Sequence, residues 1–384
     1  MPLTGLSACR RLLFPGWFGG GLSLILLTAL CWSAAKFFAW SFGEAHWSAL
    51  SANYRLFFAG RYPVESLWRL GVCSALLAGG AGLTWGWLAP VQLQGKRSRG
   101  AGLAAVGALL LLAAPGGGTA LVGVLALVLG TALSYRLGLG IQASAKPRRW
   151  LLAPFGLANL TLMFWLLLGG GGLRPVPADD LSGLVLTLLA AILSIVLSFP
   201  LGLLLALGRR SSLPVIRWLA TLYIELVRAL PLIGILFIAQ VMLPLVLPPD
   251  WRPDRVVRAI AGFTLFSAAY LAENVRGGLQ SIPQGQGEAA RALGLNPVLI
   301  LGLIILPQAL RAAIPALVGQ FLSLFKDTSL LAIVGLVDLL GMGQSILANP
   351  KFVGDYGEVY LFIALIYLVC CGALSWAGRA LEKP

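Results

Sequence analysis

Histidine and acidic residues are scarce in this sequence, which limits the chemistry that the chain can perform. One histidine, His46, and 14 acidic residues occur among 384 positions. A lone histidine excludes a zinc site built on two histidines and argues against histidine base catalysis. The acidic residues are too scattered to form an obvious catalytic cluster. We therefore predict no catalytic residue and no metal site, and we place His46 in an external loop.

Phosphate-binding and thiol motifs are also missing from the sequence. No G-x-x-x-x-G-K-[ST] loop occurs, so any nucleotide energy must come from another chain. The five cysteines have neither metal-binding nor redox spacing, and we expect them to act as small apolar residues. The 47 glycines lie mostly in apolar stretches, where small residues favour close packing of helices.

Charge of both signs is low, and long apolar runs take its place. Charged residues make up 11% of the chain, whereas soluble domains carry about 25%. The mean hydropathy is +0.89. Apolar runs of about 20 residues recur, and each is long enough to cross a bilayer as a helix. The sequence therefore predicts an all-α, polytopic membrane protein.

These runs predict about ten membrane spans, with both termini in the cytoplasm. The predicted spans are roughly 19–39, 68–90, 100–114, 117–135, 150–169, 181–207, 218–246, 257–275, 298–320 and 358–378. The stretch 100–135 can be read as one long helix, a spanning hairpin or a re-entrant hairpin. Basic residues on both flanks favour a hairpin that turns near Pro115.

The net charge of +14 is concentrated in short loops between the apolar runs. Cytoplasmic segments of this topology hold 16 of the 28 basic residues, which is the bias expected of loops kept inside the cell. The charge therefore indicates membrane lipid, not nucleic acid, as the partner. Residues 1–175 hold 14 basic and 2 acidic residues, whereas residues 176–384 hold 14 and 12. We predict an N-terminal transmembrane extension at 1–175 and a transmembrane core at 176–384, in which 321–357 is an external loop with a short half-buried helix.

Charged residues inside predicted spans mark either function or local pairing, because burying them in lipid is costly. Glu225 and Arg228 are three residues apart, as are Glu273 and Arg276, so each pair can meet within one helical turn. We predict a structural ion pair between Glu225 and Arg228.

A polar stripe precedes the second of these pairs. Thr264, Ser267 and Tyr270 lie within about 60° on one helix face, and Glu273 and Arg276 continue it. We predict that this face lies along the path of a transported solute. The alternative is that these side chains only satisfy hydrogen bonds between helices.

The segment from Gly285 to Leu310, GQGEAARALGLNPVLILGLIILPQAL, is too polar for lipid and too apolar for an ordinary exposed loop. Glu288 lies in the N-terminal half of a short predicted helix, where negative charge is favoured. Ala289 and Ala290 keep this helix slim, and a glycine can end it in left-handed geometry. Such a helix fits a groove on a partner protein. The alternative is a cytoplasmic loop that only caps a helix.

The same segment carries a recognisable motif. Glu288-Ala-Ala, three residues, Gly294, nine residues and Ile304-x-Leu-Pro match the loop motif of ABC importer permeases at every position. The stretches YIELVRALPLIGILF, AYLAENVRGGL and LFKDTSLLAIVG resemble the polar amino acid permeases. FAGRYPVESLWR resembles the M subunit of general L-amino acid permeases. The resemblance covers about 181–380 and implies a type I importer core of five spans. Five spans before that core, where such subunits usually have three, depart from the pattern.

The resemblance implies transport without catalysis by this chain. Residues 283–296 would form a cytoplasmic coupling helix. The implied ATPase-coupling residues are Glu288, Ala289, Ala290, Gly294 and Pro307. The implied partners are a dimer of ATPase subunits that uses ATP and Mg²⁺, a second homologous permease and a periplasmic amino-acid-binding protein. The chain itself would bind no cofactor, and its expected place is the bacterial inner membrane.

Two other functions stay open at this point. The glutamate-alanine-alanine motif is shared among importers of many solutes, so the cargo could be another small polar molecule. A membrane-embedded enzyme is the other possibility, and it would need an acidic or histidine cluster that faces water.

Overall fold

The computed structural model describes residues 17–88, 128–140 and 151–382, and the regular structure of these residues is helical, with isolated β-bridges only. The longer helices are α2 (Trp17–Ala39), α3 (Ser48–Ala59), α4 (Leu67–Leu88), α7 (Leu152–Leu168), α8 (Gly183–Arg209), α9 (Pro214–Ala229), α12 (Arg255–Gln280), α13 (Gln284–Ala292), α15 (Leu306–Asp327), α16 (Leu339–Leu347) and α17 (Tyr356–Glu382). The short helices are α10 (Leu232–Phe237), α11 (Leu243–Val246) and α14 (Pro297–Leu299), and residues 128–140 form a further helix. The prediction of an all-α chain is confirmed for the described residues.

Six of the described helical segments are long and apolar enough to cross a membrane. They are Trp17–Glu44, Val64–Thr84, Gly183–Arg209, Arg255–Gln280, Pro297–Ala332 and Tyr356–Arg379. Each coincides with a predicted span, and the predicted span 150–169 corresponds to the shorter apolar helix α7. The predicted spans 100–114 and 117–135 lie mostly outside the described residues. The total of ten spans and the cytoplasmic termini therefore stay predictions.

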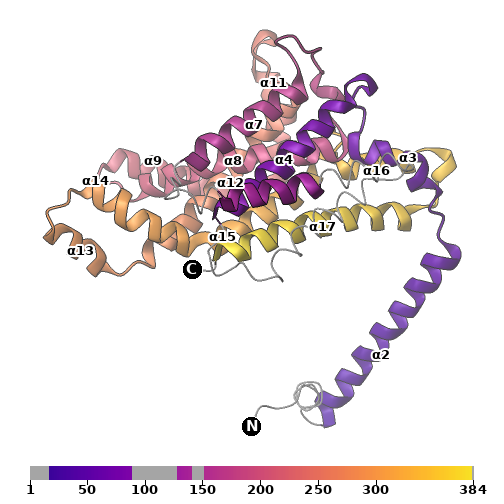
Figure 1. Cartoon of the computed structure of the whole chain (residues 1–384), viewed down its shortest axis with the longest axis horizontal. Coiled ribbons are helices and arrows are strands. Elements are labelled where there is room, and N and C mark those ends of the chain that lie inside the picture. The colour runs from indigo at the N-terminus through magenta and orange to yellow at the C-terminus, as the bar shows by residue number, and fades with distance from the viewer. Residues whose placement is uncertain (1–16, 89–127, 141–150, 383–384) are drawn as a thin grey trace.

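The predicted span at 218–246 is broken in the structure, because the chain bends by 101° between α9 and the segment Leu232–Val246. The bend falls at Leu230, whose backbone is extended (φ −94°, ψ 141°), just before Pro231. A proline ring clashes with a helical conformation of the preceding residue, so Pro231 ends α9. As a result, α9 is a separate helix, and it lies at the same end of the molecule as α13 and α14 (Figure 1).

Helices α8, α12 and α15 form the centre of the core, and small residues let them approach closely. A Cβ added to Gly202 of α8 would lie 2.7 Å from the Cβ of Leu271 on α12. A Cβ added to Gly278 of α12 would lie 2.3 Å from the carbonyl oxygen of Ala309 on α15. The expectation that glycine permits close helix packing is confirmed at these two contacts.

The N-terminal region packs against the core through α3. Phe57 of α3 is fully buried in a cluster with Leu339 of α16 and Phe362 of α17. Helix α16, within the predicted loop 321–357, is more deeply buried than expected, since its inward side chains all belong to this cluster. By contrast, α2 has no buried residue and projects away from the other described helices (Figure 1).

Candidate functional site

Helix α13 lies at the end of the molecule opposite α3 and α16 (Figure 1). Ala290 is its one buried residue, 2% exposed, and holds the helix against the chain's own core. Glu288 and Ala289 are exposed, and the large apolar side chain of Leu293, just after the helix, is 80% exposed. The side-chain amide of Gln308 on α15 makes a long contact of 3.5 Å with Gln286. The helix is thus anchored on one side and presents the other side, with an apolar leucine, to its surroundings.

The turn after α13 has the geometry that the sequence predicts. Gly294 has a φ of +77°, the left-handed conformation that glycine adopts without strain, and its N–H donates to the carbonyl of Arg291. The side chain of Asn296 then accepts a hydrogen bond from the N–H of Leu299, 2.9 Å away, and starts the next helical segment. The predicted coupling helix at 283–296 is therefore shorter in the structure, and Pro283 is its N-cap.

The helical segment just before Pro307 is wider than an α-helix. A proline has no N–H to donate to the carbonyl four residues earlier. The N–H of Leu306 donates to the carbonyl of Leu301, five residues back, and residues Ile300–Ile305 form a π-helix. Pro307 therefore lies in the first turn of α15, at the boundary between the π-helical segment and the regular α-helix.

A cluster of charged side chains ties α8, α9 and α12 together. The carboxylate of Glu273 on α12 lies 2.6 Å from Arg209 of α8, 2.7 Å from Arg276 and 3.7 Å from Arg228 of α9. The side chain of Glu273 is only 14% exposed, whereas those of the three arginines are 26–36% exposed. The three arginines compensate the cost of burying this carboxylate, and their contacts with it hold the three helices together.

The predicted ion pair between Glu225 and Arg228 does not form among the described residues. Glu225 instead pairs with Arg209 at 2.8 Å, and the guanidinium of Arg228 lies 5.6 Å from the ring centre of Tyr270. The predicted pairing of Glu273 with Arg276 is present. Arg209 was missed because helical spacing reports only on residues of the same helix. Its position at the end of the predicted span 181–207 was the one feature of the sequence that could have marked Arg209 as a partner for these acids.

The polar stripe of α12 divides between buried and half-buried positions. Thr264 and Ser267 are 9% and 1% exposed, and the hydroxyl of Thr264 has no hydrogen-bond partner within the described part of the chain. Tyr270 is half-buried, and its ring centre lies 4.7 Å from that of Phe266. Thr264 and Ser267 thus lie between the chain's own helices. Only the part of the stripe from Tyr270 onward reaches the charged cluster.

Two further polar residues lie near the start of α12: Arg258, which was not predicted, and Gln240, which the sequence offers only as one of several polar residues on the predicted spans. Arg258 donates to the backbone carbonyl of Gln240 at 2.8 Å, and the amide of Gln240 donates to the carbonyl of Arg255 at 2.6 Å. The Oε1 atom of Gln240 and the Nε atom of Arg258 are buried without a partner among the described residues. Gln240 lies in a π-helical segment (Ile238–Met242), a local irregularity that is frequent at functional sites.

Comparison with known proteins assigns this chain to a family. The family model described as "Binding-protein-dependent transport system inner membrane component" matches residues 198–383, which include α13 and the charged cluster. The inner membrane amino-acid ABC transporter permease protein YhdY of Escherichia coli is 46% identical over 223 residues, 58% of this chain and 61% of that protein. The alignment therefore spans less than two thirds of YhdY.

A second relative matches along most of both chains. The glutamate/glutamine/aspartate/asparagine transport system permease protein BztC of Rhodobacter capsulatus is 38% identical over 362 residues, 88% of this chain and 78% of BztC. A solved structure described as an amino acid ABC transporter with histidines is 30% identical and covers 52% of this chain and 91% of its own, with a TM-score of 0.48. The chain belongs to the family of binding-protein-dependent transport system inner membrane components, and its relatives YhdY and BztC are permease proteins of amino-acid transport systems.

Proposed function

We propose that this chain is the membrane-spanning permease subunit of an ATP-driven importer of L-amino acids in the bacterial cytoplasmic membrane. The observation that carries the proposal is α13, a short helix with one buried residue and an exposed face at one end of the bundle. Its sequence contains the full loop motif of such permeases. Helix α13 would lie in a groove on an ATPase subunit, and closure of the ATPase dimer on ATP and Mg²⁺ would move α13.

Contacts within the core would transmit a displacement of α13 to the transmembrane helices. Arg209, Arg228 and Arg276 each lie within 4 Å of Glu273, so α8, α9 and α12 are linked near the end of α12 that leads into α13. Close packing of Gly278 against α15 joins α12 to the helix that follows α13. Displacement of α13 would thus be transmitted to the bundle as a tilt of packed helices.

The names of the relatives support an amino-acid cargo. BztC is named for glutamate, glutamine, aspartate and asparagine. We take these four L-amino acids as the first candidates for this chain's cargo. The proposed path follows Thr264, Ser267 and Tyr270 toward Glu273 and Arg276, beside a second homologous permease, after delivery by a periplasmic binding protein. The chain itself would bind no cofactor.

The test is purification followed by reconstitution. The chain is expected to co-purify with an ATPase and a second permease, and proteoliposomes of the complex should take up a labelled amino acid only with ATP and the binding protein. Purification of this chain alone, with transport or catalysis that does not need ATP, would overturn the proposal.

The coupling role has its own matched pair of variants. Glu288→Lys reverses the charge on the exposed face of α13 and should reduce ATP-dependent uptake at least tenfold without loss of membrane insertion. Glu65→Lys makes the same change at a side chain that is 78% exposed and distant from α13 in sequence, and it should leave uptake within twofold of wild type. Equal uptake by both variants would contradict the assignment of Glu288.

A further inference from the structure

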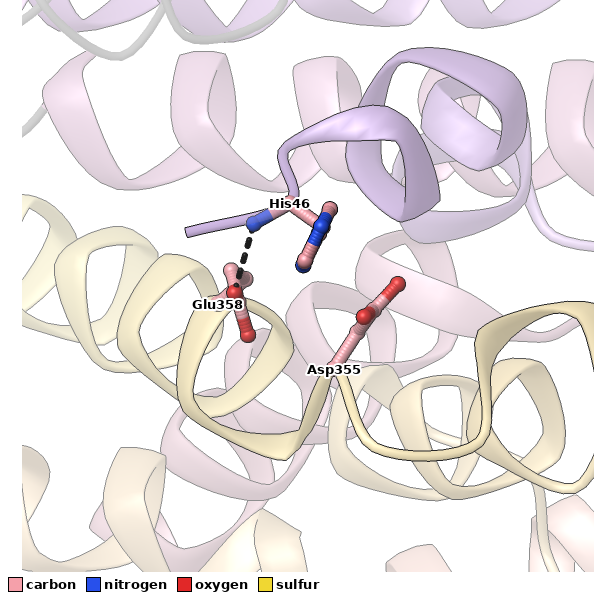
Figure 2. A group of neighbouring side chains, drawn as sticks. All are labelled: His46, Asp355 and Glu358. Atoms are coloured by element: carbon pink, nitrogen blue, oxygen red, sulfur yellow. Dashed lines mark hydrogen bonds between the residues drawn. The ribbon is translucent and has the colours of Figure 1, made fainter. Parts of the chain in front are cut away.

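The sequence's one histidine meets two carboxylates from the other end of the chain. His46 lies between α2 and α3, and Asp355 and Glu358 lie at the start of α17, about 310 residues later. One ligand atom from each of the three side chains lies within 4.8 Å of the other two. In Figure 2 the imidazole ring of His46 lies between the two carboxylates. We propose that these residues bind a divalent transition-metal ion, with Zn²⁺ the best match, that fastens the N-terminal extension to α17.

Glu358 has binding capacity that the protein does not use. This residue is 4% exposed, and its Oε1 atom accepts a hydrogen bond from the backbone N–H of His46 at 2.8 Å. No other donor to its carboxylate occurs among the described residues. A buried carboxylate needs neutralisation as well as hydrogen bonds, and one backbone amide supplies no charge. A cation beside the second oxygen would supply it.

Helix capping does not account for the two acids. Asp355 and Glu358 occupy the N-cap and N3 positions of α17, where side chains usually accept hydrogen bonds from backbone N–H groups of their own helix. Within the described residues neither carboxylate accepts such a bond, and the one bond present leads to His46. Their arrangement is directed toward the histidine, as expected of ligands that share an ion.

The surrounding pocket is acidic in a chain that is strongly basic. An open pocket of about 580 Å³ is lined by three acids, Glu44, Asp355 and Glu358, and by one cation, Lys351. The whole chain has only 14 acidic residues and a net charge of +14. Three of those acids around the sole histidine produce a local negative field that attracts a divalent cation.

The ligand set favours zinc over the hard cations. Calcium and magnesium prefer oxygen ligands alone, whereas one imidazole and two carboxylates suit a tetrahedral Zn²⁺ ion with water in the fourth position. Zinc bonds of about 2.0–2.2 Å require ligand atoms roughly 3.4 Å apart. Since the ligand atoms lie within 4.8 Å of one another, each pair must close by at most about 1.4 Å. His46 is exposed and Asp355 is only half-buried, so both side chains have room to move inward.

The bound ion would restrict the orientation of α2 relative to the other helices. Trp40, at the start of the π-helical turn after α2, already contacts this region, since a Cβ on Gly357 would lie 2.8 Å from its ring. Beyond that contact α2 has no buried residue. A metal bridge from His46 to α17 would restrict the direction of α2 at the end of the molecule opposite α13 (Figure 1).

The experiment is zinc titration of the full chain in nanodiscs, in competition with a chromophoric chelator. Wild type, His46→Ala and Asp355→Asn carry the same five cysteines, so zinc bound by thiols cancels in the comparison. We expect one more zinc ion per chain in wild type than in His46→Ala, at least tenfold weaker binding in Asp355→Asn, and a larger zinc-induced rise in melting temperature in wild type than in either of these two variants. Glu65→Gln removes an exposed acid that does not line this pocket and should bind zinc within threefold of wild type.

Zinc X-ray absorption separates the remaining outcomes and does not depend on variant folding. Nitrogen and oxygen ligands at about 2.0–2.2 Å support the site, whereas sulfur ligands at about 2.3 Å overturn it. Equal stoichiometry and affinity in wild type and His46→Ala would mean adventitious binding only and would also overturn the proposal.

Discussion

Arg209 at the end of α8 donates a hydrogen bond to Glu273 of α12, with 2.6 Å between Nη1 and Oε1. The same guanidinium donates through Nη2 to Glu225 of α9 at 2.8 Å. One arginine thus links three helices whose residues are up to 64 positions apart. The two contacts use different nitrogens of one guanidinium, and lysine, whose donors all lie on a single nitrogen, could not reproduce this geometry.

Glu273→Gln should destabilise the protein. It leaves Arg276 and Arg228 without their acidic partner and weakens the hold on Arg209. Loss of a buried carboxylate costs about 3–5 kcal/mol, and partial exposure of the arginines reduces this to about 1–3 kcal/mol. Thermal unfolding in detergent should show a lower midpoint, by about 2–4 °C per kcal/mol.

Glu225→Gln is the control for that variant. Its side chain is 55% exposed, so loss of its pairing with Arg209 should cost less than about 1 kcal/mol. If the two variants melt at the same temperature, Glu273 is not the centre of the cluster.

Gly278→Ala should disturb the contact of α12 with α15. The new methyl group would lie 2.3 Å from the carbonyl oxygen of Ala309, closer than any real contact, so the helices must move apart. Overpacking of this kind costs about 1–3 kcal/mol. The neighbouring change Gly277→Ala meets nothing within 4 Å and should be neutral or slightly stabilising, because alanine favours helix. Melting curves of the two variants check the difference, and equal midpoints would contradict it.

Much of the fold could be predicted from hydropathy because helices that cross lipid need long apolar runs. The left-handed Gly294 was also predictable, since its cause is local. The bend after α9 could have been read from Pro231, yet its 101° angle depends on packing that a linear pattern does not contain. Local rules therefore located the helices and one turn, but not the direction of the chain between them.

The charged contacts show where sequence reasoning fails. Spacing of three residues predicted Glu273 with Arg276 correctly and Glu225 with Arg228 wrongly, because a partner from another helix, Arg209, was closer. His46 and Glu358 are 312 residues apart, and no periodicity relates them. Contacts between distant segments depend on how whole helices pack.

Asp338 should make stability depend on pH. It is fully buried at the N-cap of α16, where it accepts hydrogen bonds from Leu340 and Gly341. Burial raises the pKa of Asp338 from 3.8 to about 6, so the folded state holds its proton where the unfolded state has lost it. Stability from this residue therefore falls as pH rises from about 4 to about 6 and is constant above that, by up to about 3 kcal/mol.

Asp338→Asn tests that dependence, since the amide cannot titrate and its oxygen can still accept from Gly341. The difference in melting temperature between wild type and the variant should change between pH 4.5 and pH 7.5 in favour of the variant at the higher pH. A difference that is constant across this range would show that Asp338 keeps an ordinary pKa in the folded protein.

Thr264→Val separates a role in transport from a role in packing. The Thr264 hydroxyl is buried without a partner among the described residues, so its replacement by a methyl group of similar shape should stabilise the fold by about 1 kcal/mol. If the hydroxyl instead serves the passing amino acid, uptake by the reconstituted complex should fall several-fold although the protein melts at a higher temperature. Opposite changes in stability and uptake are difficult to explain by packing alone. Unchanged uptake in a stabilised variant would remove Thr264 from the proposed path and leave Ser267 as the first polar side chain on it.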